Sequence, residues 1–346
     1  MGRRRLTIRD IARIANVSRS TVSLALNDSP RINPDTKRRV LEIVEEMDYH
    51  PNAMARALVG GRTRVLSLLV PQIDHVFSDF YFSETVSGVT DVVARLGYSL
   101  MLEVATESFI SNGVVDRLFK ERRIDGMLVV GTLTTDDWLD ILREKKRPVC
   151  LINSEREGFS SVVADNRAGA GRVVDHLVEL GHREIGYIKG LDITTVGLHR
   201  DEGFRAALER HGIAYDEAMV AYGNFSEESG YEAMRKLLER PRCPRAIFAT
   251  NDSMAIGAMH AIQERGLSVP GDVSLAGGDD IRLARYISPR LTTIRQPMDL
   301  IGSQAAEILF DRLGLEPGGG SVPAEEPTVR MIDTELIVRE SCGPAS

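Results

Sequence analysis

The side chains that most often carry out catalysis do not stand at catalytic spacings in this 346-residue chain. Its seven histidines include no His-Glu-x-x-His pair, and the sequence has neither a Gly-x-Ser-x-Gly turn nor a glycine-rich phosphate loop with lysine. Cys150, Cys243 and Cys342 lie far apart, which argues against a disulfide framework or a thiolate metal site. We therefore predict that the chain is not an enzyme and uses no cofactor or metal.

The strongest binding signal is the segment 16–36, NVSRSTVSLALNDSPRINPDT. Ser18 suits the residue that caps a helix, because its hydroxyl can accept from a backbone N–H of the first turn. The apolar residues spaced to face a core are Val17, Val22 and Leu26. The polar side chains that project from the other side are Arg19, Ser20 and Ser23. A DNA-reading helix places such side chains against base edges and phosphates, and the alternative is a small helical bundle with a solvated polar face.

Two further helices are predicted around this one. Thr7 can cap a helix through IRDIARIA, with Asp10 in a capping-box position. A third helix is predicted to start after Asn33, with Pro34 in its first turn, and to end at about Met47. Two helices joined by a tight turn and braced by a third form a helix-turn-helix unit.

Charge is distributed unevenly along the chain. Residues 1–64 hold 13 Lys and Arg against 7 Asp and Glu, a balance of +6, whereas the rest of the chain carries −13. A basic head on an acidic body indicates a polyanionic partner for the head alone. The basic amino terminus lacks the apolar run of a secretory signal, and no run is long enough to span a membrane. We therefore expect a cytoplasmic protein with no membrane partner.

From about Val65 the pattern changes to alternating strands and helices. Apolar runs of strand length, separated by helical stretches, are typical of doubly wound parallel sheets. The predicted strands are too many for a single sheet, so we divide the chain after Val65 into two lobes near residue 162. The predicted parts are a helix-turn-helix domain (1–50), a hinge helix and linker (51–64), lobe 1 (65–162 plus 295–324), lobe 2 (163–294 plus 325–340) and a tail (341–346).

The segment YHPNAMARALVGGRT contains a short candidate helix after Asn52. Gly60 and Gly61 end it after about eight residues, and isolated helices below about 12 residues are marginally stable in water. We therefore expect it to order between two surfaces. The alternative is a plain linker.

Several motifs in a fixed order make this sequence resemble the LacI/GalR family of bacterial transcriptional regulators, from about residue 6 to 340. They are IRDIARIANVSRSTVSLALND, YHPNAMARAL, HRDEGF, TNDSMAIGAMHAIQERGLSVPGDVSLAGGDD and LTTIRQP. The resemblance implies a homodimer whose heads bind a pseudopalindromic duplex DNA operator and whose hinge helices enter the minor groove. It also implies a two-lobed core, similar to periplasmic sugar-binding proteins, that binds a small effector in its cleft.

The resemblance assigns DNA-binding roles residue by residue. Its base-reading positions are Arg19, Ser20 and Leu24, and its phosphate-contacting positions are Ser18, Thr21, Ser23 and Asn27. Leu58 matches the hinge leucine that wedges between base steps, with Ala55 beside it. Leu24 departs from the arginine common in the family, and an apolar side chain there can contact only a thymine methyl.

The resemblance also assigns the effector site. The second-lobe positions are Arg200, Phe225, Asn251 and Asp279, and the first-lobe positions are Asp74, Phe77 and Phe80. Asp279 follows an apolar strand, at the carboxyl end where open sheets bind ligands. We expect Arg200 to lie at the start of a helix. We also expect the variant Asp279→Asn to keep a melting temperature near that of the wild type. Gly278 replaces the family's aromatic residue, a departure expected to open the cleft.

The resulting prediction is a repressor of carbohydrate uptake or catabolism genes, controlled allosterically by a sugar. Arginine, carboxylate and amide groups suit vicinal hydroxyls, while an aromatic ring covers the apolar face of a sugar. The alternatives are a regulator that responds to a purine or another non-sugar metabolite, and a sugar-binding protein without DNA function.

Overall fold

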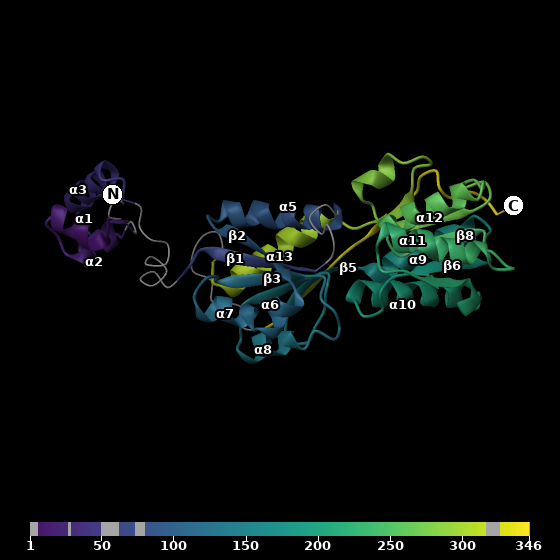
Figure 1. Cartoon of the computed structure of the whole chain (residues 1–346), viewed down its shortest axis with the longest axis horizontal. Coiled ribbons are helices and arrows are strands. Elements are labelled where there is room, and N and C mark those ends of the chain that lie inside the picture. The colour runs from purple at the N-terminus through teal and green to yellow at the C-terminus, as the bar shows by residue number, and fades with distance from the viewer. Residues whose placement is uncertain (1–5, 27–28, 50–61, 73–79, 316–325, 346) are drawn as a thin grey trace. The chain divides into compact units, whose positions relative to one another are not determined.

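Two units make up the chain, and we call Met1–Arg64 the head and Val65–Ser346 the core. The computed structural model describes residues 6–26, 29–49, 62–72, 80–315 and 326–345 (Figure 1). No helix among these residues is both long and apolar enough to cross a lipid bilayer.

The head contains the three predicted helices, α1 (Ile8–Ile14), α2 (Arg19–Leu26) and α3 (Pro34–Glu46). Their starts are fixed locally. The Thr7 backbone N–H and hydroxyl both donate to the Asp10 carboxylate, and the Asn33 side chain accepts from the Asp35 N–H at 2.9 Å. The buried residues that join the helices are Ile11, Ala12, Ala15, Val22, Ala25, Val40 and Tyr49. This arrangement confirms the predicted helix-turn-helix unit.

The core contains two six-stranded sheets, which define two lobes. The first sheet has the order β11-β5-β4-β3-β1-β2, with all neighbouring strands parallel. Its strands are β1 (Val65–Pro71), β2 (Ser99–Ala105), β3 (Gly126–Val130), β4 (Val149–Ile152), β5 (Ser160–Ala164) and β11 (Val329–Ile332). The helices of this lobe are α5 (Phe80–Arg95), α6 (Glu107–Ser111), α7 (Val114–Lys120), α8 (Trp138–Glu144) and α13 (Met298–Arg312).

The second sheet has the order β12-β10-β9-β8-β6-β7 and is parallel except for β12, which runs antiparallel to β10. Its strands are β6 (Ile185–Lys189), β7 (Val220–Tyr222), β8 (Ala246–Ala249), β9 (Ser274–Asp279), β10 (Thr292–Arg295) and β12 (Glu335–Ile337). The α-helices of this lobe are α9 (Asn166–Glu179), α10 (Thr195–Arg210), α11 (Glu227–Leu238) and α12 (Asp252–Glu264), and the short 3-10 helices are Glu217–Met219 and Arg282–Arg285.

Helices cover both faces of each sheet, as expected for doubly wound lobes. In the first lobe, α5 and α13 share a core on one face, and α7 and α8 share a core on the other. In the second lobe, α11 and α12 cover one face, and α9 and α10 cover the other. Gly302 lets α13 approach α5, because a Cβ there would stand 2.4 Å from the Thr85 carbonyl oxygen. The predicted fold class is confirmed.

The chain crosses between the lobes as predicted at α13 and β12, but two predicted boundaries differ from the sheet pairing. Residues 325–340 were expected in lobe 2, yet β11 pairs with β5 of the first sheet. The predicted border at residue 162 falls inside β5, which lies wholly in the first sheet. Both strands are too short for their sequences to reveal which sheet they join.

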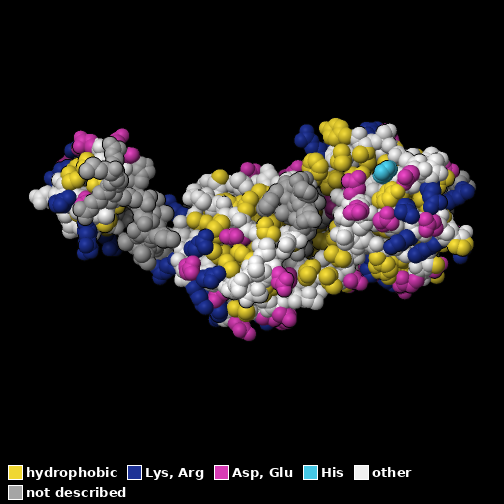
Figure 2. Space-filling view, in the orientation of Figure 1, with side chains coloured by type: hydrophobic (Ala, Val, Ile, Leu, Met, Phe, Trp, Pro, Cys, Tyr) yellow, Lys and Arg dark blue, Asp and Glu magenta, His cyan; other side chains and the backbone are white. Residues whose placement is uncertain are grey.

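Charged side chains cover much of the visible surface of the core (Figure 2). On the first lobe, Lys and Arg side chains gather beside α7 (Figures 1 and 2).

Candidate functional site

The polar side of α2 is built by its cap. The Thr21 N–H donates to Ser18 Oγ at 3.0 Å, and the two hydroxyls lie 2.8 Å apart. Val22 and Ala25 face the core, while Arg19, Ser20 and Leu24 are exposed. The helix therefore presents a prearranged outer face, as predicted for a DNA-reading helix.

The electrostatics of α2 suit a polyanion. Its sequence, RSTVSLAL, contains no carboxylate that would repel phosphate. Arg19 is exposed, and among the described residues no carboxylate pairs with its guanidinium. Thr21 and Ser23 are half-buried. The predicted contacts Asn27, Ala55 and Leu58 lie outside the described residues.

In the core, the carboxyl ends of parallel strands of the second sheet bring polar groups together. Thr250 follows β8, Asp279 ends β9 and Gln296 follows β10. Parallel strands end at the same edge of a sheet, so these residues come from separate parts of the sequence to one edge. We call it the effector edge, after the effector site that the sequence predicts there.

The Arg200 guanidinium makes three hydrogen bonds at this edge. Its Nε donates to Asn166 Oδ1 at 2.8 Å, one terminal nitrogen donates to the Thr250 carbonyl, and the other donates to Asp279 Oδ1 at 2.7 Å. The residue is only 1% exposed. It lies in the second turn of α10, which begins at Thr195, so the predicted helix start at Arg200 was wrong; the Thr194 cap sets it.

A chain of amide groups continues from Asp279 to the first lobe. Gln296 Nε2 donates to Asp279 Oδ1 at 2.6 Å, and Asn153 Nδ2 lies 3.3 Å from Gln296 Oε1 and 2.9 Å from the Tyr81 hydroxyl. Sequence reasoning missed these three partners. The signal was available, because Asn153 follows the predicted strand VCLIN just as Asp279 follows VSLAGG.

Asn251 and Phe225 lie together at the same edge. Asn251 caps α12 by accepting from the Met254 N–H at 3.0 Å, and its amide donates to the Phe225 carbonyl at 3.0 Å. Phe225 has φ 74° and Asp279 has φ 127°, conformations that cost a non-glycine residue of order 1 kcal/mol or more and that cluster at ligand sites. The edge therefore holds two strained residues beside its polar groups.

Asp252 lies beneath the edge. It accepts from the Thr293 hydroxyl at 2.5 Å and from the Ile281 N–H at 2.8 Å. Burial, reinforced by the charge of Asp279, raises the pKa of Asp252 to about 7. Close carboxylates in a low-dielectric site oppose each other's ionisation.

The departure at Gly278 does not open a space of its own. A Cβ at Gly278 would lie 2.7 Å from the Thr250 carbonyl oxygen and 2.9 Å from an Arg200 guanidinium nitrogen. The guanidinium already fills the position beside the glycine. The expectation that this departure opens the cleft was wrong at this point.

The first lobe contributes fewer of the predicted residues. Phe80 begins α5 and is 37% exposed, while Asp74 and Phe77 lie outside the described residues. The lobes also meet near the start of α10, where the Thr134 N–H donates to the Ile193 carbonyl at 2.8 Å and the Glu155 N–H donates to Thr195 Oγ1 at 3.1 Å.

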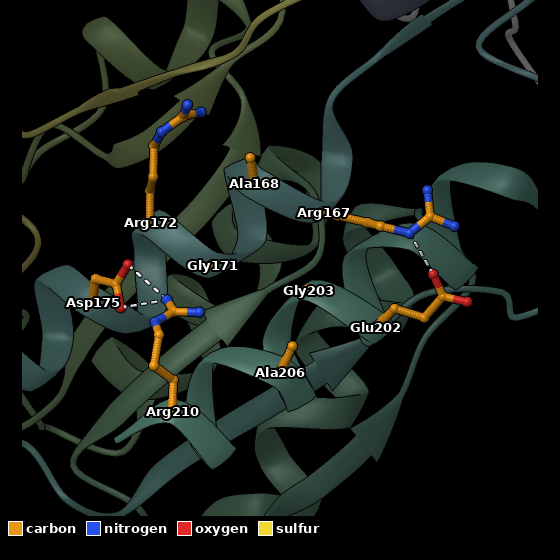
Figure 3. A pocket seen from close by; sticks show the side chains of 9 residues that line it. All are labelled: Arg167, Ala168, Gly171, Arg172, Asp175, Glu202, Gly203, Ala206 and Arg210. Atoms are coloured by element: carbon orange, nitrogen blue, oxygen red, sulfur yellow. Dashed lines mark hydrogen bonds and ion pairs between the residues drawn. The ribbon is translucent and has the colours of Figure 1, made fainter. Parts of the chain in front are cut away.

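A separate surface pocket of about 450 Å³ lies between α9 and α10 (Figure 3). Its floor is made of small residues, and its charged side chains are engaged: Arg167 pairs with Glu202, and Arg210 pairs with Asp175. None of the predicted effector residues lines this pocket. It results from the close approach of the two helices, since a Cβ at Gly203 would stand 2.2 Å from the Arg167 carbonyl oxygen.

Comparison with known families matches both units. Residues 7–52 match the family described as bacterial regulatory proteins, lacI family, and residues 174–342 match the periplasmic binding protein-like domain.

Individual proteins are similar over nearly the whole chain. The probable HTH-type transcriptional repressor ExuR of Bacillus subtilis (strain 168) is 32% identical over 97% of this chain and 98% of its own. The HTH-type transcriptional repressor PurR of Escherichia coli O139:H28 is 35% identical over 97% and 96%. Among solved structures, a CelR–cellobiose complex is 31% identical with a TM-score of 0.74, covering 97% and 100% of the two chains. The Lac repressor dimer bound to operator and the anti-inducer ONPF is 25% identical with a TM-score of 0.84, covering 98% and 99%.

Proposed function

Because the chain belongs to the LacI family of bacterial transcriptional regulators, we propose that it represses carbohydrate uptake or catabolism genes and is controlled by a sugar bound at the effector edge. As a DNA-binding repressor of this family it acts through operator DNA. We place its action in the cytoplasm, as a homodimer whose two heads bind a pseudopalindromic operator.

The observation that carries the effector proposal is the convergence at the effector edge. Arg200 and Asp279 form a buried ion pair there, and Asn251 and Phe225 add an amide and a ring. An ionised carboxylate and a guanidinium make charge-assisted bonds with vicinal hydroxyls, whereas the ring suits the apolar face of a sugar. Asp74, Phe77 and Phe80 are proposed to complete the site from the first lobe.

The similar structures support a sugar as the effector. Cellobiose is bound in the CelR complex, and ribose is bound in a LacI-family regulator from Enterococcus faecium that is 28% identical with a TM-score of 0.71. A purine or another non-sugar metabolite is the second candidate, because amide and aromatic groups also suit a planar base.

A ligand panel tests the proposal. The full-length protein is heated with individual sugars and, separately, with purines, and its unfolding is followed. A ligand at about 100 times its dissociation constant stabilises by about 2.7 kcal/mol. Stabilisation by a sugar, together with a change in operator affinity measured by fluorescence anisotropy, supports the proposal. Stabilisation by purines alone would establish the second candidate instead.

A further inference from the structure

Two turns at the amino ends of β3 and β4 carry an unusual number of cations. The first turn follows α7 and the second follows α8. We call their exposed and half-exposed basic residues the basic edge: Lys120, Arg122, Arg123, Lys145, Lys146 and Arg147. Figure 2 shows Lys and Arg side chains gathered beside α7.

Both turns end a helix in the same way. The Arg123 N–H donates to the Leu118 carbonyl at 2.9 Å, and the Arg147 N–H donates to the Leu142 carbonyl at 2.9 Å. These bonds place Arg122 at φ 53° and Lys146 at φ 50°. Glycine is usual at this left-handed position because a side chain there is strained. The chain has a cation at both places where glycine would cost less.

One buried carboxylate joins the two turns into a single surface. Asp116 lies 2.8 Å from Lys120, 2.7 Å from Lys145 and 3.0 Å from Arg147. These cations hold the pKa of Asp116 well below its usual range, although burial acts in the opposite direction. Besides Asp116, the acids in or beside these turns are Glu121, Asp125 and Glu144, so the six cations leave the basic edge with a net charge of +2 within a core whose balance is −13.

The basic edge adjoins the point where the chain enters the core from the head. The Asp125 N–H donates to the Val65 carbonyl at 2.8 Å, and the Met127 N–H donates to the Pro148 carbonyl at 3.0 Å. Val65 directly follows Arg64, and both Arg64 and Arg62 are exposed. The cations thus lie at the edge of the first sheet opposite its carboxyl ends, where the linker from the DNA-binding head terminates.

We propose that the basic edge binds backbone phosphates of the duplex that flanks the operator. Among the described residues, Arg122, Arg123 and Lys146 form no side-chain ion pair, and all three are exposed, so their charges can meet phosphates. Phosphate contacts position a protein on DNA without reading its sequence, and each releases counterions. The inference rests on operator binding by the head, whose chain continues directly into β1.

The test compares two duplexes. The short one contains the operator alone, and the long one adds flanks of about 20 bp, roughly two helical turns, on each side. Operator affinity of the full-length protein is measured across a salt series for both. The variant Arg122→Gly/Lys146→Gly removes two charges and relieves two left-handed side chains, so its melting temperature should not fall.

We expect this variant to bind the short duplex like the wild type and the long duplex several-fold more weakly. The slope of log affinity against log salt on the long duplex should decrease by roughly 3.6, because the homodimer loses four phosphate contacts and each changes the slope by about 0.9. The control Lys236→Gln/Arg242→Gln removes two exposed cations from the second lobe. Its affinity and its salt slope should match those of the wild type on both duplexes.

The proposal would be overturned if the variant bound the long duplex with the affinity and the salt slope of the wild type. The cations would then have another role, such as stabilising the helix ends or binding an acidic protein. Equal losses on both duplexes, or equal losses in the control, would also overturn it. Retained binding to the short duplex shows separately that the head functions, so failure of this inference is distinct from failure of the proposed function.

Discussion

The polar groups on the outer face of α2 and those at the effector edge of the second sheet differ in exposure and in hydrogen bonding. On α2, Arg19 and Ser20 are exposed, and the capping bonds lie elsewhere on the helix. At the effector edge, Arg200 and Asp279 are buried and already bonded to each other. The face of α2 that is predicted to read DNA is exposed to an external partner, whereas an effector at the proposed site would have to replace existing hydrogen bonds with its own. Under the proposed function, this replacement of hydrogen bonds would couple effector binding to rearrangement at the edge.

Breaking the buried pair should have the largest effect. Asp279→Asn leaves the Arg200 charge buried without a carboxylate, which should lower the free energy of unfolding by about 3 to 5 kcal/mol. The structure therefore replaces the sequence-based expectation that the melting temperature stays near that of the wild type. Chemical denaturation measures the loss.

The surface variant Asp333→Asn is the matched control for this change and should shift stability by less than about 0.5 kcal/mol. The double variant Arg200→Met/Asp279→Asn should lose less than the two single changes together, because no charge is then left unpaired. Strict additivity would show that the pair is not coupled and that the contrast with α2 is false.

The pH dependence of Asp252 sharpens the same contrast. The pKa of Asp252 is raised to about 7 in the folded protein, above that of an aspartate in the unfolded chain. The contribution of this carboxyl to the free energy of unfolding is therefore greatest below the unfolded-state pKa, and it decreases as the pH rises toward and through 7. Between about pH 5 and pH 7 this carboxyl should lower the free energy of unfolding by about 2 kcal/mol. The variant Asp252→Asn, which cannot ionise, should lack this part of the pH dependence. Parallel stability profiles for variant and wild type would contradict the assignment.

Much of the fold could be predicted because it is specified locally. The helix starts in the head could be predicted because capping depends only on neighbouring residues, here Thr7, Ser18 and Asn33. The apolar runs predict most of the strands. The sheet that β11 joins could not be predicted, because the partner of a four-residue strand is set by residues far away in the sequence. The same limit applies to the site. Asp279 could be placed at a strand end, but its bonds to Arg200 and Gln296 arise only when separate strands end at one edge.

On the DNA-reading side, Arg19→Ala should change sequence preference. Arg19 is the one residue among those predicted to read bases that can make a bidentate contact with a base, worth about 1 to 3 kcal/mol of discrimination. Selection of binding sites from a random library measures the preferred half-site. Arg13→Ala removes an equal charge from α1, where the side chain is 78% exposed, and should leave the preference unchanged. An unchanged half-site for Arg19→Ala would show that α2 does not read bases through this residue.

The smallest effect is expected for Leu24→Ala. Leu24 is 36% exposed on the outer side of α2, so truncation creates no core cavity, and alanine has the higher helix propensity. An apolar side chain can gain only contact with a thymine methyl, so operator affinity should change by less than about 0.5 kcal/mol, and any change should be confined to operators with thymine at one position. Binding to matched operators with thymine or uracil at that position measures this, because uracil lacks only the methyl group. A large loss on both operators would show that Leu24 supports the whole interface, so that polar contacts alone would not account for binding by α2.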